Sequence, residues 1–303
     1  MIGLLLLTAF LAEVQTDVSI SFPILPFCQE GTVSGEDSEE KKEKVEKAPP
    51  IPPLSALERD KLKRFLKFMK TSNLKKRRGY EDKLIAIGRG AIPSLLEKAE
   101  TTHVHLAPAV DRCLLVLLDV RDAKILGDFS RSKTVRLRRI AIAKYAGAAR
   151  PGDKEIIKGF LKDTDAAIRL EAALGLVKMK DPAGIPEIIV ASAGASGREK
   201  KRILADVALL KGKIYSSHFR SLATKHKDPK VRKAALELIV AIGDKRVKDV
   251  LGLALRDDHN LVKTAAVNAL RQLIKGEKPT TFETVFALVD AVEKWQKELG
   301  LAR

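Results

Sequence analysis

Apolar residues recur along this chain at steps of three and four, and the whole pattern returns about every 31 to 33 residues. One repeat, VRKAALELIVAIGD at 231–244, places six of them on such a stripe: Val231, Ala234, Ala235, Leu238, Ile239 and Ile242. This spacing is typical of the buried face of an α-helix. Similar segments begin at Ile168 and Val262. A fixed period of this length predicts a solenoid, in which stacked helix pairs share one continuous core.

Each repeat carries a basic residue at one position, which we call the anchor. With Arg232 as reference, the anchors are Arg77, Arg136, Arg169, Lys200 and Lys263, and one poorly matching unit fits near His105. Four residues before each anchor stands a side chain suited to a helix N-cap: Asn73, Ser132, Asp165, Ser196, Asp228 and, in the last unit, His259. Glycines recur where a left-handed residue would end the helix: Gly88, Gly147, Gly212, Gly243 and Gly276.

A shorter helix should accompany each long one, because AIPSLLEKA from Ala91 and GIPEIIVAS from Gly184 match at a distance of about three repeats. The last segment opens with Thr280 and Glu283 in capping-box spacing. It continues with an apolar stripe of Val285, Phe286, Val289, Val292 and Trp295. We therefore predict an all-α fold: an α-solenoid over 55–300, with about six to seven helix pairs and a C-terminal capping helix.

The repeat core D-x-x-V-R-x-A-A-x-x-L, clearest at 228–236, resembles HEAT-like repeats in the short bacterial form also seen in phycobilin lyases. The Ile-Pro pairs at 92–93 and 185–186 extend the resemblance, which covers roughly residues 57–276. It implies a scaffold that binds other proteins, and only occasionally an enzyme. It also implies that the anchors Arg136, Arg169 and Arg232 pair with acidic residues of neighbouring units.

Residues 1–54 belong to no repeat. The apolar run Ile2–Ala12 is too short to span a bilayer and has the length of a secretory signal core. No basic residue precedes it, and Phe10 stands where a signal peptidase prefers a small side chain, so a mis-assigned start or a disordered tail is the alternative. We predict a signal peptide at 1–17 and a mature protein without a transmembrane span. The protein would then be exported, to the periplasm or outside the cell; otherwise it is cytoplasmic.

The segment 18–54 contains a mixed charge block and the run APPIPP, a composition that favours a disordered tether. The chain has two cysteines, Cys28 in this tether and Cys113 in an apolar helical stretch. This number does not indicate a disulfide framework, and we expect Cys113 to be a small buried residue.

The net charge of +17 is concentrated around the anchors, in windows that contain the turn into each long helix. In a regular stack these turns line up, and the helix N-termini add partial positive charge there. We predict a basic edge that could bind a polyanion, formed by Lys75, Lys76, Arg78, Arg131, Lys133, Arg136, Arg138, Arg139, Arg198, Lys201 and Arg202. A generic solubilising surface is the alternative. The preceding segment, 59–70, adds six more basic residues against Asp60.

Signals of catalysis are weak. The chain has no His-Glu dipeptide, no glycine-rich phosphate loop and no nucleophile elbow, and aromatic residues make up 5%. His103 and His105 have no third ligand at a defined spacing, so a loop pair is favoured over a metal site. We predict a non-catalytic protein-interaction scaffold without metal or small-molecule cofactor. The alternative is a nucleic-acid or polyanion binder that uses the basic edge.

Overall fold

The computed structural model describes residues 47–210, 216–243 and 245–301, with the side chains of 216–218 left out. By contacts the chain divides into two units, 1–45 and 46–303, and the described residues all belong to the second. They contain fifteen α-helices and no strand, which confirms the predicted fold class. The predicted signal peptide, most of the tether and Gly212 lie outside the described residues.

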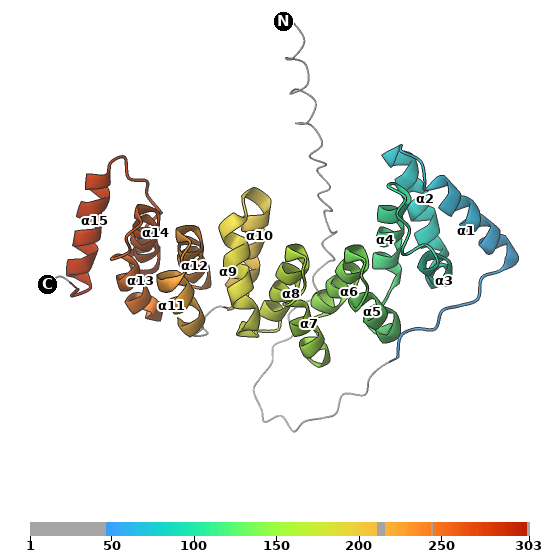
Figure 1. The fold of residues 1–303 in the computed structure, drawn as a ribbon, viewed down its shortest axis with the longest axis horizontal. Helices are drawn as coiled ribbons and strands as arrows, with labels where there is room; N and C mark the ends of the chain where they lie inside the picture. Colours follow the sequence, from blue (N-terminus) through green and yellow to red (C-terminus); the bar gives the residue numbers. More distant parts are fainter. Residues whose placement is uncertain (1–46, 211–215, 244, 302–303) are drawn as a thin grey trace, which may run out of the picture. The chain divides into compact units, whose positions relative to one another are not determined.

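Fourteen helices form seven consecutive pairs of antiparallel neighbours, which succeed one another in chain order (Figure 1). The pairs are α1 (Ala56–Phe68) with α2 (Leu74–Ile87), α3 (Ile92–Leu96) with α4 (Leu106–Leu117), α5 (Ala123–Ser130) with α6 (Val135–Ala148), α7 (Lys154–Phe160) with α8 (Ala166–Lys178), α9 (Ile185–Gly194) with α10 (Gly197–Val207), α11 (Ser216–Lys225) with α12 (Pro229–Ile242), and α13 (Lys248–Ala254) with α14 (Asn260–Leu270). The last helix, α15 (Val285–Glu298), packs on α14. Short 3-10 turns precede several of the shorter helices, as Pro182–Gly184 does before α9.

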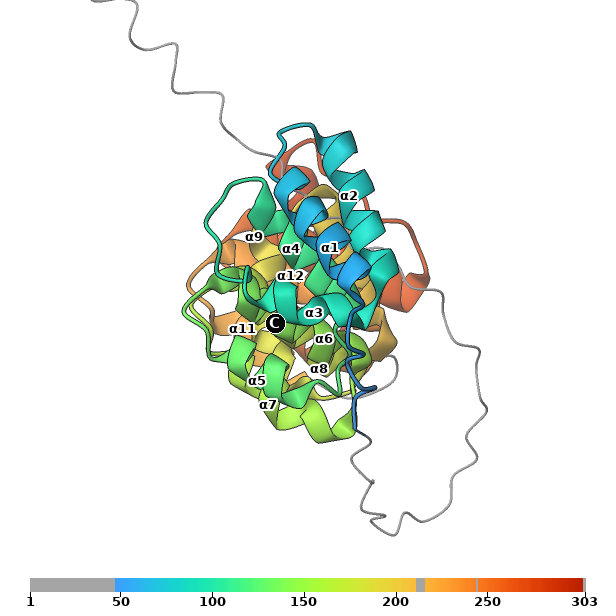
Figure 2. The same ribbon diagram turned by 90° about the vertical axis from the view of Figure 1, so that its right-hand side faces the viewer.

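Successive long helices pack on one another, and the shorter helices cover them on one side. In the view along the stack, α6 and α8 lie one behind the other, as their contact requires (Figure 2). The buried apolar side chains form two clusters that meet at α8. Ile168, Ala172 and Leu176 belong to the cluster on the α1 side, while Leu174 and Val177 belong to the cluster on the α15 side.

The capping residues confirm most of the predicted helix starts. Asn73, Asp165, Asp228 and His259 are the N-caps of α2, α8, α12 and α14, and each accepts a hydrogen bond from a first-turn amide. Ser196 is the N-cap of α10, but its side chain makes no such bond. These bonds satisfy amides that the helix itself leaves unpaired.

In the unit of α6 the predicted register is wrong by two residues. The N-cap is Thr134 instead of Ser132. The anchor is Arg138 instead of Arg136, because the Nη1 atoms of Arg138, Arg169 and Arg232 all donate to the carbonyls five and six residues earlier. Three other basic residues, Lys133, Arg138 and Arg139, lie within three positions of Arg136, so residue type alone could not identify the anchor.

The helix ends follow the same corrected register. Eleven residues after the anchor, φ is positive at Gly88, Ala149, Lys180 and Gly243, with values of 82°, 47°, 58° and 72°. Gly147 lies inside α6, so its prediction as the stop residue is wrong. The geometry of the turn requires a positive φ at this position. Ala149 and Lys180 adopt it although they carry a side chain, which costs backbone strain.

The terminal helix differs from its prediction in two ways. Its N-cap is Thr284, whose hydroxyl accepts from the amide of Ala287, so the proposed capping box of Thr280 and Glu283 does not start it. Leu288, Val292 and Trp295 face the stack. The other three stripe residues are turned away from it: Val285 is 59%, Phe286 83% and Val289 42% exposed. The helix does pack on the end of the stack, but three of the five residues of the predicted stripe face solvent.

Candidate binding surfaces

The turns into the long helices form one edge of the stack, and most of its arginines are engaged in ion pairs. Arg138 binds Asp163 through Nε at 2.7 Å and Nη2 at 2.9 Å, and Arg232 binds Asp257 with nearly the same geometry. Each aspartate also accepts the backbone amide two residues later, in the turn into the next unit. These pairs therefore join neighbouring repeats, as the family resemblance implied for Arg232.

The electrostatics of these pairs favour the charged forms. The hydrogen bond from Arg138 lowers the pKa of Asp163 below its ordinary value, against the opposing effect of burial. Asp163 likewise raises the pKa of Arg138. The side chains are only 7% and 13% exposed, so the two charges compensate one another where water is scarce.

Five further residues of the predicted basic edge also have acidic partners. Arg78 shares the buried carboxylate of Glu81 with Arg77 and Arg112. The other pairs are Arg131–Asp128, Arg136–Asp111, Arg139–Asp165 and Arg202–Glu171. Six of the eleven members therefore have an acidic partner; the pairing of Arg136 is the one that the family resemblance implied, and the partners of the other five were not predicted. The partners were missed because most of them lie 25 to 31 residues away in sequence, in a neighbouring repeat.

The remaining members of the edge form no ion pair with another residue of the described ranges. They are Lys75, Lys76, Lys133, Arg198 and Lys201, all exposed. They lie at the starts of α2, α6 and α10. The structure thus leaves separate cationic positions on the predicted basic edge, with neutralised arginines between them.

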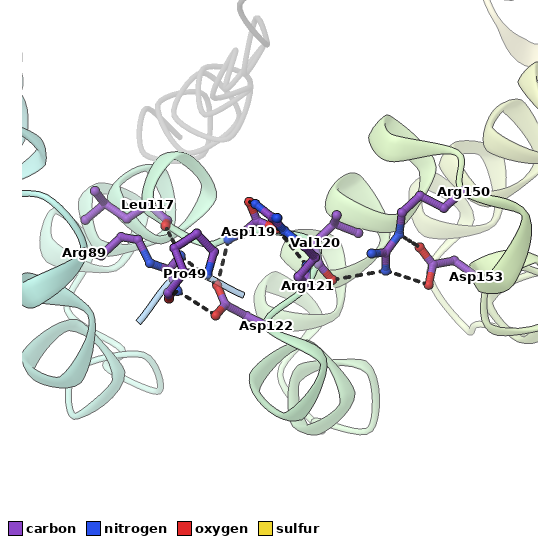
Figure 3. A network of polar contacts seen from close by, with 9 residues as sticks. All are labelled: Pro49, Arg89, Leu117, Asp119, Val120, Arg121, Asp122, Arg150 and Asp153. Carbon is purple, nitrogen blue, oxygen red and sulfur yellow. Dashed lines mark hydrogen bonds and ion pairs between the residues drawn. The ribbon is translucent and has the colours of Figure 1, made fainter. Parts of the chain in front are cut away.

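The opposite edge, where the long helices end, carries a second polar network (Figure 3). Arg89 binds Asp122 with both terminal nitrogens, at 3.0 and 2.8 Å, and donates to the carbonyls of Leu117 and Pro49. Arg150 pairs with Asp153 in the next unit. The Arg89 contact fastens the described end of the predicted tether to the stack, where Leu54 packs against the core. This network is structural and presents few free groups.

A groove of about 800 Å³ crosses the exposed faces of α10, α12 and α14 and ends at α15. Small or apolar side chains make up much of its lining: Leu204, Val240, Ala241, Leu261, Ala265, Ala269, Phe282, Val285 and Leu288. On its rim, Glu237 pairs with Lys200 at 2.7 Å and with Lys233 at 3.6 Å. The groove therefore has an apolar interior and a nearly balanced charge.

The end wall of the groove is held by a residue that the sequence analysis did not single out. Asn268 donates to the carbonyl of Thr280 at 2.9 Å and accepts its amide at 2.8 Å. These two hydrogen bonds hold the segment 279–284 over α14. An Asn in the middle of a helical repeat was the available signal, because polar residues there need a partner when they are partly buried.

The described residues offer little for metal or thiol chemistry. They contain no group of three or more His, Cys, Asp or Glu side chains able to hold a metal ion. His103 Nδ1 accepts the amides of His105 and Leu106, so the histidine pair is part of the turn into α4. Cys113 is fully buried, as predicted, and burial raises its pKa to about 12. None of the described helices has the length and apolar character needed to cross a bilayer.

Comparison with known families agrees with this architecture. Residues 216–294 match the family model for HEAT repeats, a range that spans α11 to α14 and most of α15. This match and the stacked helix pairs support the predicted HEAT-like repeat architecture, an α-solenoid. Comparison with curated proteins found no match. Repeats of this kind commonly mediate protein interactions.

Proposed function

We propose that this protein is a non-catalytic scaffold that binds a segment of a partner protein in the groove across α10, α12 and α14. The observation that carries the proposal is the combination of this groove with the exposed Val285, which lines its end. A solenoid buries its repeats against one another and leaves its long helices as an extended binding surface. Exposed apolar side chains next to an apolar groove are typical of interaction sites.

The chemistry of the groove favours an apolar protein segment as its occupant. The small side chains of Ala241, Ala265 and Ala269 let a partner's side chains reach the helix backbones. Glu237 balances Lys200 and Lys233, so the rim offers no excess charge to attract a polyanion. Pockets that bury a partner's apolar anchor contribute most of the affinity in protein interfaces.

Site-specific photo-crosslinking in the producing cells tests this proposal. A crosslinker at Gln272, inside the groove, should give a discrete adduct with a protein partner. The same group at Glu155, exposed on α7, is the matched control and should give none. Thr264→Trp, which fills the groove from a partly exposed position, should remove the Gln272 adduct without lowering the melting temperature. Equal adducts from Gln272 and Glu155, or an adduct insensitive to Thr264→Trp, would reject the groove.

Export is a separate part of the proposal, supported by the apolar run 2–12 and the tether-like segment that follows it. Fusion of the full chain to a reporter enzyme that is active only outside the cytoplasm measures it. We expect activity, and its loss when Leu5 and Leu6 are replaced by Arg. An inactive reporter with normal protein levels would place the scaffold in the cytoplasm.

Polyanion binding at the basic edge is the second candidate function, supported by the five edge cations without acidic partners. Binding of nucleic acid or heparin should then fall steeply with salt, because each neutralised phosphate releases counterions. Replacing Lys133, Arg198 and Lys201 by Glu should abolish it. Arg138 is unsuitable for this reversal, since its ion pair with Asp163 holds two repeats together. Binding that is independent of salt would eliminate the edge.

A further inference from the structure

The first helix, α1, carries a dense group of cations that the rest of the described chain does not neutralise. Its exposed residues include Arg59, Lys61, Lys63, Arg64 and Lys67, and Lys70 lies in the turn just after it. None of these six cations forms an ion pair with another described residue. Two acidic residues accompany them: Asp60, and Glu58, which is bound to Ser55 at the N-cap. This differs from the basic edge, where six of eleven cations have partners. We call these six residues the α1 cationic face.

Exposed apolar side chains lie among these cations. Leu57 is 65% and Phe68 43% exposed, and Leu74 at the start of α2 is 55% exposed. Leu57, Lys61, Arg64 and Phe68 follow one another at steps of four, three and four, so they share one side of the helix. The opposite side, with Leu62 and Leu66, is buried against the stack.

The aromatic end of this side is held in place. The Phe68 ring stacks on Tyr80 of α2 with 5.1 Å between centroids, and the Lys83 ammonium lies 5.6 Å from the centre of the Tyr80 ring. Phe68 is thus a half-exposed apolar group that is packed on Tyr80. The arrangement is part of the folded pair α1–α2 and exists before any partner binds.

We propose that the α1 cationic face binds the surface of an anionic lipid bilayer, with its cations on the headgroup phosphates and Leu57 and Phe68 at the boundary of the acyl chains. A lipid surface satisfies both kinds of side chain at once, because cations bind its headgroups and apolar tips enter its interface. A nucleic acid would satisfy the cations but would leave the aliphatic Leu57 and Leu74 without a suitable contact. The proposal does not depend on the scaffold function of the groove.

Binding at this face should be peripheral and reversible. The apolar side of α1 is already buried in the stack, so the helix cannot insert as a free amphipathic helix does. Attraction to the headgroups therefore supplies much of the affinity, and it decays within a Debye length. We expect binding to weaken as salt is added and to retain a residual part from Leu57 and Phe68.

Vesicle flotation with the full chain tests the proposal. Phosphatidylcholine vesicles with and without phosphatidylglycerol are compared at low and high salt. Any binding by residues 1–46 is common to all variants, so the ratio of their partition coefficients reports the contribution of α1. Lys61→Glu, Arg64→Glu and Lys67→Glu combined should lower the partition coefficient on anionic vesicles about a hundredfold or more. The matched control, Lys133→Glu, Arg198→Glu and Lys201→Glu combined, carries the same net charge and should lower it far less.

A second variant separates the apolar contribution. Leu57→Ser with Phe68→Ser keeps every charge and should remove the binding that remains at high salt. Circular dichroism and the melting temperature confirm that each variant is folded. Three results would overturn the proposal: equal losses in the two triple variants, binding that ignores phosphatidylglycerol, or tighter binding of a single-stranded oligonucleotide than of anionic vesicles with the same dependence on Lys61, Arg64 and Lys67.

Discussion

The ion pair between Arg138 and Asp163 permits a sharp test of the corrected repeat register. Arg138→Ala removes two hydrogen bonds to the Asp163 carboxylate and two to the carbonyls of Ser132 and Lys133. It also leaves Asp163, which is 7% exposed, without its countercharge. Breaking a buried pair from one side costs about 3–5 kcal/mol. Because this pair lies at the edge of the stack, we expect a loss of about 3 kcal/mol.

Arg139→Ala is the matched control, since Arg139 is adjacent, has the same charge and makes one 2.9 Å contact to Asp165. Its side chain is 49% exposed, and exposed pairs contribute about 0–1 kcal/mol. Urea unfolding followed by circular dichroism measures both variants. A double-mutant cycle with Asp163→Asn should show strong coupling for Arg138 and little for Arg139. Equal shifts of the urea midpoint for the two alanine variants would refute the assignment of Arg138 as the anchor.

Four further results are expected. Asp228→Ala should lower stability by about 1 kcal/mol and Ser196→Ala by less, because only Asp228 makes a capping bond; equal changes in melting temperature would contradict this. Ala149→Gly should raise stability by about 0.5–1 kcal/mol, since it relieves a left-handed alanine; a lower urea midpoint would count against that strain. Removing the residues after Gly276 should expose the apolar face of α14 and cause aggregation, which light scattering detects; a soluble, cooperatively melting fragment would contradict it. The difference in free energy of unfolding between the protein and its Asp163→Asn variant should be full above about pH 4, the pKa of an aspartate in the unfolded chain, and should disappear as pH falls through the lowered pKa of Asp163 in the folded protein. A difference that is unchanged in urea titrations at acid pH would argue against the pair.

Local sequence features predicted the architecture well because they act within a few residues. The apolar stripe, the N-cap and the stop residue each depend on one helical turn, so Asp228 and Gly243 could be placed from their neighbours alone. The prediction of the register was wrong at α6, where two neighbouring positions were both suitable for the N-cap. Thr134 and Ser132 are both capping residues, and the turn geometry, not the residue type, decided between them.

The candidate surfaces were harder to predict because their chemistry depends on partners that are distant in sequence. Whether Arg138 is a free cation depends on Asp163, in the turn into the following repeat. Helical periodicity also could not show which side of α15 meets the stack, since Phe286 and Val292 are both apolar. The choice of side follows from how the segment 279–284 is held by Asn268.

The two core clusters that meet at α8 set how the ends of this protein can influence one another. In a stack stabilised by nearest neighbours, free energy passes from repeat to repeat through shared interfaces. Ile168 and Leu174, on two faces of one helix, belong to different clusters. We therefore expect thermodynamic communication between α1 and the α12–α14 groove to depend on α8 and on Leu161, which packs against both clusters. On this view the stack consists of two cooperative blocks, and the packing around α8 sets the strength of the link between them.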